Sequence, residues 1–333
     1  MPRRPRAILL GGKIPFSIFN GCTSMIRTQL SVNLNKVALV RNSREGNWPD
    51  PVFFGRIALE AGAAGLTVHP RPDERHIRRT DLAPLKALVD AYPGREFNIE
   101  GNPFENLMPI LKEIRPHQAT FVPDAADQKT SDHGFEFNNP EVREKLAAVV
   151  AEAQSYGCRV SLFMDPEPEF TRWAKETGSD RIELYTEGYA AAYGTALEED
   201  ILQPYVDSAL LCDELALGVN AGHDLSLENL EKLLTACGNI QEVSIGHALT
   251  VEALQFGFAE TIRRYNELLD RVAAKPRVFP QEQAAHAAFL FCPPVLCRLW
   301  PFAPKAGALS LCARQRTCDC VVKVHCPPGR GKD

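Results

Sequence analysis

Short apolar runs alternate with amphipathic stretches through the middle of this chain, and this alternation restricts the possible fold more than any other feature. The apolar runs are rich in Val, Ile, Leu and Phe, as the buried strands of a parallel sheet are. Each run therefore predicts a strand. The eight predicted strands cover residues 31–35, 65–70, 96–101, 118–123, 159–165, 181–187, 215–222 and 242–248.

Apolar residues at helical spacing fill the segments between these runs. The eight predicted helices cover residues 51–62, 81–91, 103–114, 140–156, 166–177, 196–213, 226–236 and 250–272. The first is the clearest, because Asp50 supplies an N-cap, Pro51 suits the first turn and Gly62 can act as the C-cap. Residues 224–226 and Thr250 offer further N-caps.

Strands that alternate with helices form βαβ units around a parallel sheet. Eight such units in roughly 245 residues match the usual size of a TIM barrel. A doubly wound sheet is the alternative, but it more often has a glycine-rich first turn, and no GxGxxG follows the first run here. We therefore predict an α/β fold, a TIM (βα)₈ barrel with eight parallel strands over residues 29–275.

The composition excludes some partners. The chain has 333 residues, 45% of them hydrophobic, and a formal net charge of −5, so it can bury a substantial core. This mild acidity gives no reason to expect nucleic acid, whereas small anionic substrates need only a local cluster of positive groups. No apolar stretch reaches the length of about 18 residues that would indicate a membrane helix, so no membrane partner is expected.

The compartment follows from the amino terminus and the cysteines. Basic residues open the chain, but Lys13 and Pro15 interrupt the apolar run and no clear cleavage site follows, so we predict no secretory signal. The cysteines of the main body are scattered and suggest a reducing compartment without a disulfide framework. We expect a cytoplasmic protein.

The chain changes character after Pro276. Six of the ten cysteines crowd between Cys292 and Cys326, and no helical or strand period remains. The cysteines here have no second pair at zinc-ligand spacing, so no zinc site is predicted. We expect residues 1–28 and 276–333 to be poorly ordered extensions of the barrel.

Proton carriers gather at the predicted strand ends, where the active sites of TIM barrels lie. His69, His223 and His247 each fall at the end of a predicted strand, and His76 follows one closely. Histidine carries protons at neutral pH, so several at one mouth indicate acid–base chemistry. Any one of them alone could equally be a hydrogen-bonded structural residue.

Three carboxylates occupy similar positions. Glu100 follows an apolar residue near the end of its strand, so it is either paired with a cation or a base with a raised pKa. We interpret Asp165 and Glu183 as anchors for loop amides or for Arg and Lys partners. The histidines and Glu100 could in principle form a metal cluster, but no HxH or HExxH spacing is present, so no metal is predicted.

Phosphate binding is also indicated. The loops after the seventh and eighth strands of TIM barrels often bind phosphate, and here they begin with Gly222 and Gly246. Glycine lets backbone N–H groups approach an anion closely. Asp224 could instead simply cap the next helix. The candidate cationic partners of a phosphate are Lys36, Arg41, Arg44, Arg71 and Arg75.

Taken in order, several segments resemble the pyridoxine 5′-phosphate synthase family. They are LSVNLNKVALVRNSR, GLTVHPRPDERHI, NIEG, VSLFMD, IELYTEGYA, VNAGHDLSLENL and VSIGHAL, and they cover nearly all of the predicted barrel. The resemblance implies a cytoplasmic TIM-barrel enzyme, typically a homo-octamer, that needs no metal or organic cofactor. The implied reaction condenses 1-deoxy-D-xylulose 5-phosphate with 3-amino-2-oxopropyl phosphate to pyridoxine 5′-phosphate, phosphate and water.

The resemblance also implies roles for individual residues. His69 and Glu100 would be general bases, His223 the general acid, and Glu183 a structural or transition-state support. The loop at 124–138 is a candidate lid over the substrates. The implied substrate contacts are Asn33, Asn35, Lys36, Arg44, Arg71, His76, Thr130, Asp224, Gly246 and His247.

The chain departs from the family pattern at several points. Asn35 and Lys36 stand where the family commonly has Asp-His, so an amide and a cation replace a carboxylate and an imidazole. We expect a divergent branch that keeps the function. Asp224 follows the histidine where the family often has Gly. The first 24 residues and the tail after 276 are also unlike the family, which a misassigned start codon and a frameshift would explain.

Two other functions remain open. The chain could be another phosphate-binding TIM-barrel aldolase or isomerase. A Schiff-base aldolase needs a desolvated lysine near a strand end, and Lys36 is the only lysine so placed. The second alternative is a non-catalytic paralogue that binds sugar phosphates. Its weakness is that a pure binder does not need His69, Glu100 and His223 together.

Overall fold

Eight parallel strands close into a barrel in the computed structural model, which describes residues 25–124 and 131–276. The strands pair in chain order, and β1 closes the barrel by pairing with both β2 and β8. The predicted fold is therefore confirmed. The strands are β1 (Gln29–Asn33), β2 (Gly65–Val68), β3 (Glu96–Gly101), β4 (Gln118–Phe121), β5 (Arg159–Met164), β6 (Arg181–Tyr185), β7 (Gly218–Gly222) and β8 (Glu242–Ile245).

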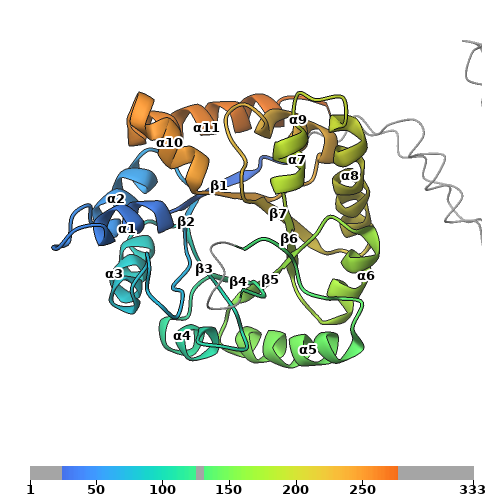
Figure 1. Ribbon diagram of the computed structural model, residues 1–333, viewed down its shortest axis with the longest axis horizontal. Helices are drawn as coiled ribbons and strands as arrows, with labels where there is room; N and C mark the ends of the chain where they lie inside the picture. Colours follow the sequence, from blue (N-terminus) through green and yellow to red (C-terminus); the bar gives the residue numbers. More distant parts are fainter. Residues whose placement is uncertain (1–24, 125–130, 277–333) are drawn as a thin grey trace, which may run out of the picture. The chain divides into compact units, whose positions relative to one another are not determined.

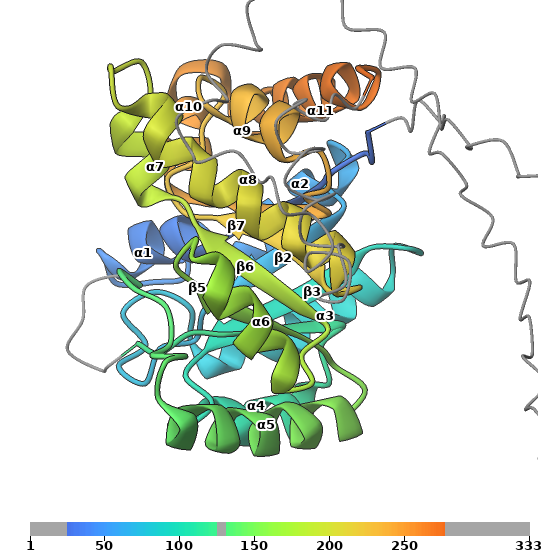
Figure 2. The ribbon, with the colours of Figure 1, turned by 90° about the vertical axis from the view of Figure 1, so that its right-hand side faces the viewer.

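Helices surround the strands on all sides (Figure 1), and the side view places α4 and α5 opposite α10 and α11 (Figure 2). The helices are α1 (Asn35–Asn42), α2 (Pro51–Glu60), α3 (Arg79–Asp90), α4 (Leu107–Ile114), α5 (Pro140–Ser155), α6 (Pro168–Glu176), α7 (Glu187–Ala192), α8 (Glu198–Glu214), α9 (Leu230–Cys237), α10 (His247–Phe256) and α11 (Phe258–Ala273).

The helix boundaries agree with the sequence at α2 and differ near the carboxyl end. The Asp50 carboxylate accepts a hydrogen bond from the Val52 amide at 3.0 Å, so the predicted N-cap is confirmed. The predicted helix 250–272 is two helices, separated at Gly257, whose φ of +84° suits glycine. The first of them begins at His247. The predicted N-cap Thr250 is therefore wrong, and its hydroxyl donates to the Gly246 carbonyl instead.

The inside of the barrel is polar. Gln118 on β4 donates to Glu242 on β8 at 3.0 Å, and Ser244 on β8 contacts Glu100 on β3. Because these strands are not neighbours, the side chains must meet across the interior. Apolar residues that alternate with them along the strands point outward to the helices, as Val32 and Leu66 do.

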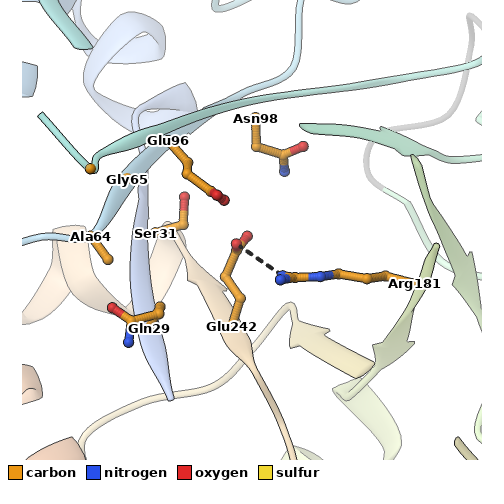
Figure 3. A pocket seen from close by; sticks show the side chains of 9 residues that line it. Gln29, Ser31, Ala64, Gly65, Glu96, Asn98, Arg181 and Glu242 are labelled. Atoms are coloured by element: carbon orange, nitrogen blue, oxygen red, sulfur yellow. Dashed lines mark ion pairs between the residues drawn. The ribbon is translucent and has the colours of Figure 1, made fainter. Parts of the chain in front are cut away.

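A cavity of about 150 Å³ lies at the amino ends of the strands (Figure 3). Its lining includes Gln29, Gly65 and Glu96, the first residues of β1, β2 and β3. Within it, Nη1 of Arg181 lies 3.6 Å from Oε2 of Glu242. This ion pair, with Gln118 beside it, lies at the end of the barrel opposite the predicted active site.

Arg41, a candidate phosphate ligand in the sequence, is a structural residue instead. It is fully buried, and its guanidinium donates to both carboxylate oxygens of Asp81, at 2.7 and 2.9 Å. It also donates to the His76 carbonyl at 2.9 Å. This ion pair joins α1 to α3 and fixes the segment that carries His76.

Candidate active site

A larger cavity, of about 360 Å³, opens at the carboxyl ends of the strands. Its volume is in the range of sites for small molecules. Its lining residues lie at the carboxyl ends of all eight strands or in the segments that follow them. The predicted site residues that line it are Asn33, Asn35, Lys36, His69, Arg71, His76, Glu100, Glu183, His223, Asp224, Gly246 and His247.

Two predicted site residues are not among them. Arg44 lies exposed after α1 and does not line the cavity. Thr130 falls outside the described residues, as does the middle of the predicted lid, residues 125–130. Ser131, the first described residue after that gap, does line the cavity.

Glu100 lies deep in the cavity beside His69. Its Oε2 is 4.0 Å from Nδ1 of His69 and accepts a hydrogen bond from the Asn33 amide at 3.3 Å. Burial raises the pKa of Glu100 to about 7, and the nearby charge of Asp124 acts in the same direction. Of the two alternatives drawn from the sequence, the raised pKa describes this carboxyl group, which can gain and lose a proton near neutral pH.

His69 is buried, and burial holds its pKa well below the ordinary value, with Arg71 adding to the effect. The imidazole is therefore neutral at neutral pH and able to accept a proton. Its backbone amide donates to the side chain of Asn35 at 2.9 Å, which ties the end of β1 to the end of β2.

Asp124 is a site residue that the sequence did not reveal beyond its place at the start of the predicted lid. It is buried, forms an ion pair with Arg71 and accepts a hydrogen bond from the Ser131 hydroxyl at 2.8 Å. Its Oδ2 lies 3.8 Å from Nε2 of His69. His69 thus lies between two carboxyl groups, Asp124 on one side and Glu100 on the other.

The carboxylates interpreted as anchors differ. Asp165 accepts a hydrogen bond from the Gly134 amide at 3.2 Å, as an anchor of a loop does. Glu183 instead faces the interior, where the Thr120 hydroxyl donates to it at 3.5 Å. Burial, together with the charge of Glu100, raises the pKa of Glu183 well above its usual range. The raised pKa favours the protonated carboxyl group of Glu183, which can donate a hydrogen bond.

His223 and Asp224 follow β7 as a hydrogen-bonded pair. Nδ1 of His223 lies 2.6 Å from Oδ2 of Asp224. The Asp224 side chain therefore does not cap α9, which begins at Leu230 after Asn229. The interpretation of Asp224 as a helix cap is wrong, and its carboxylate belongs to the cavity.

Positive and hydrogen-bond-donating groups also line the cavity. Lys36, Arg71 and Arg75 contribute cations, and Gly246 and His247 form the amino-terminal end of α10, which favours anions. Burial lowers the pKa of His76 to about 4, with Arg71 and Lys36 adding to the shift. Because Nδ1 of His76 accepts from the Ile77 amide at 2.9 Å, the neutral ring carries its proton on Nε2.

A metal site is not found among residues 25–124 and 131–276. No group of three or more His, Cys, Asp or Glu side chains in these ranges is placed to hold a metal ion. Within the same ranges, none of the helices combines the length and the apolar character needed to cross a membrane.

Comparisons with known proteins place this barrel among related enzymes. The family described as "Pyridoxal phosphate biosynthesis protein PdxJ" matches residues 30–271. The chain is 50% identical over 243 residues to the pyridoxine 5′-phosphate synthase of Albidiferax ferrireducens, covering 72% of this chain and 96% of that protein. It is also 50% identical over 241 residues to the synthase of the same name from Chelativorans sp., covering 71% of this chain and 96% of that protein.

A solved structure is similar in fold alone. The tryptophan synthase alpha chain from Legionella pneumophila superposes with a TM-score of 0.50 at 12% identity, covering 75% of this chain and 94% of that one. At 12% identity, this similarity supports the barrel fold alone.

Proposed function

The chain belongs to the PdxJ family of pyridoxal phosphate biosynthesis proteins. We propose that the residues of its barrel cavity close a pyridine ring by acid–base catalysis. Its activity is that of a pyridoxine 5′-phosphate synthase. It condenses 1-deoxy-D-xylulose 5-phosphate with 3-amino-2-oxopropyl phosphate, and the products are pyridoxine 5′-phosphate, phosphate and water. The reaction serves vitamin B6 biosynthesis.

The observation that carries the proposed mechanism is the set of proton carriers around one cavity. Joining the amine to the ketone, eliminating phosphate and closing the ring each need a proton moved at a defined atom. Glu100, with its pKa near neutrality, and neutral His69 take protons as general bases. His223, hydrogen-bonded to Asp224, gives a proton as the general acid. Glu183 supports developing charge by donating from its protonated carboxyl group.

The two phosphate groups bind to the cationic and hydrogen-bond-donating groups of the cavity. Arg71 and the Nε2–H group of His76, together with Thr130, hold deoxyxylulose phosphate. Asn33, Gly246 and His247 hold the amino-ketone phosphate, where the amino end of α10 adds donors for its oxygens. Arg44 has no part in this proposal for a single chain, because it does not line the cavity.

Asn35 and Lys36 form a working alternative to the Asp-His pair of other family members. Asn35 uses its side-chain oxygen to hold the His69 amide, and Lys36 lines the cavity as a cation. The pair thus keeps a structural contact and supplies a charge for an anionic substrate. We assign this chain to a branch of the family that works with this pair.

Membership of the family also supports a proposal for the compartment and the assembly of the enzyme. The chain acts in the cytoplasm as a homo-octamer, and residues 29–275 form its catalytic domain. The match to the family over residues 30–271 supports this domain boundary. Large apolar side chains at the surface, such as Trp48 before α2 and Phe53 in α2, support assembly with other copies.

Genetic complementation tests the function. A bacterial strain that lacks its own pyridoxine 5′-phosphate synthase should grow without added pyridoxine when it carries this gene. The His69→Asn variant, produced at the same level, should not restore growth. Growth that still requires pyridoxine, despite folded protein in the cells, would contradict the proposal and favour a non-catalytic sugar-phosphate binder.

A further inference from the structure

The hydrogen bond between His223 and Asp224 depends on an unusual backbone. The two residues have φ values of +76° and +50°, in the left-handed region that few residues other than glycine adopt. This backbone brings Nδ1 of His223 to 2.6 Å from Oδ2 of its own neighbour in sequence. Such conformations persist where the surrounding structure holds them, and they gather at functional sites.

The surroundings do hold this turn from both sides. The hydroxyl of Thr186, just after β6, donates to the Gly222 carbonyl at 2.7 Å and also contacts the His223 carbonyl. Asn229, just before α9, donates from its side chain to the Asp224 carbonyl at 3.1 Å. The pair is therefore fixed by contacts with neighbouring elements.

The His223 ring is also fixed by what it touches. The ring of Tyr185 meets it edge to face, with centroids 5.3 Å apart and planes at 77°. Among the described residues, Lys36 on α1, His247 on α10 and Glu100 on β3 interact electrostatically with the pair. The hydrogen bond from His223 holds the pKa of Asp224 below its usual value, with Lys36 and His247 acting in the same direction.

The ionised carboxylate determines which nitrogen of His223 reacts. An ionised carboxylate can only accept hydrogen bonds, so Nδ1 of His223 must be the donor. Nδ1 is then occupied, and Nε2 is the nitrogen that exchanges a proton with a ligand. Both residues line the cavity, so this arrangement sits where the substrates bind.

We propose that Asp224 is a positioning residue, which fixes the orientation and the tautomer of His223 so that Nε2 delivers the proton to the bound substrate. The inference rests on the proposed function, because it assumes His223 as the general acid. It gives the Asp224 side chain a task in the reaction that is separate from any backbone contact with substrate phosphate.

The first test measures the hydrogen bond between His223 and Asp224 in the absence of substrate. Nitrogen-15 spectra of the full-length protein should show a hydrogen-bonded, downfield Nδ1–H resonance that disappears in His223→Gln. The resonance should be lost or move upfield in Asp224→Asn. Asparagine tolerates the left-handed backbone, so the turn itself should remain. Asp207→Asn, the same substitution on the exposed surface of α8, should leave the resonance unchanged.

The second test measures kcat and KM in the same variants. Asp224→Asn should lower kcat by about tenfold to a hundredfold, a part of what general acid–base catalysis contributes. KM for each substrate should stay within about twofold, because the variant keeps a polar group of the same size there. Asp207→Asn should keep the wild-type kcat.

The outcomes distinguish a failure of the positioning role from a failure of the proposed function. A resonance that keeps its wild-type position in Asp224→Asn, an unchanged kcat, or a change in KM alone would overturn the positioning role. A wild-type protein that shows the resonance but forms no pyridoxine 5′-phosphate would overturn the proposed function, and the role of the pair in it, while leaving the hydrogen bond established.

Discussion

Nδ1 of His69 and Oε2 of Glu100 lie 4.0 Å apart at the ends of the neighbouring strands β2 and β3. This separation is longer than a hydrogen bond, and a substrate atom that lies beside the two groups can be within hydrogen-bond distance of both. Burial shifts the pKa values of the two residues in opposite directions, because it lowers the pKa of His69 and raises that of Glu100. Both shifts favour the neutral form of the side chain, and the pKa of Glu100, about 7, lies near neutral pH.

The pKa of Glu100 predicts the acidic limb of the pH profile. A general base must be deprotonated, so kcat/KM should rise as the pH increases through about 7. Stability should change in the opposite sense. The folded-state pKa lies above the unfolded value, so the folded protein binds the extra proton and loses stability as the pH rises from about 4.5 to about 7.

Thermal unfolding of Glu100→Gln measures that second effect, because glutamine cannot titrate. Between these pH values, the melting temperature of the wild type should fall relative to that of the variant. Glu113→Gln, an exposed substitution on α4, serves as the control and should follow the wild type. Parallel curves for wild type and Glu100→Gln would show that Glu100 titrates normally.

Lys36→Met should weaken substrate binding more than turnover. Lys36 contributes a cation to the cavity, so KM for a phosphorylated substrate should rise by about tenfold while kcat changes by less than about threefold. Borohydride treatment in the presence of substrate should leave Lys36 unmodified when the protein is examined by mass spectrometry. A reduced adduct on Lys36 would favour a Schiff-base aldolase instead.

Arg41→Met should destabilise the barrel. Its guanidinium is fully buried against Asp81, and removing one partner of a buried ion pair costs about 3–5 kcal/mol. The exposed pair of Arg79 and Glu113 provides the control, and Arg79→Met should cost less than about 1 kcal/mol. Urea unfolding measures both. Equal losses in the two variants would contradict the structural role of Arg41.

Gly222→Ala should displace Glu183. A Cβ atom at this position would overlap Oε1 of Glu183, which is buried and has little room to move. Overpacking of this kind costs about 1–3 kcal/mol, and turnover should fall with it. Gly188→Ala is the control, because its Cβ would meet only the Tyr205 hydroxyl at 3.7 Å. A stable and fully active Gly222→Ala would show that Glu183 is free to shift.

The sequence predicted the barrel because each strand is a short apolar run between helices. It missed α1 and α7 for local reasons. In α1 the apolar residues at 37–40 are consecutive and show no helical period, and α7 has only six residues. The predicted start at Thr250 was late because the first turn of α10 begins directly at a strand end with His247.

Most of the residues predicted for the site line the cavity, because the active sites of TIM barrels lie at the carboxyl ends of the strands. The sequence also left gaps. It could not identify Asp124, whose partner Arg71 is 53 residues away along the chain. Arg41 was misread for the same reason, because its partner Asp81 lies 40 residues further along the chain. The contact between His223 and Asp224 depends on backbone angles that no residue pattern specifies.

Ring closure itself is the most direct test of the account. The purified protein should be mixed with 1-deoxy-D-xylulose 5-phosphate and freshly generated 3-amino-2-oxopropyl phosphate. Pyridoxine 5′-phosphate, identified by mass and absorbance, and inorganic phosphate would then be measured together. We expect equal amounts of the two products, and a loss of activity of about 10²-fold or more in Glu100→Gln with its fold intact. No product from a folded wild type that binds deoxyxylulose phosphate would contradict it.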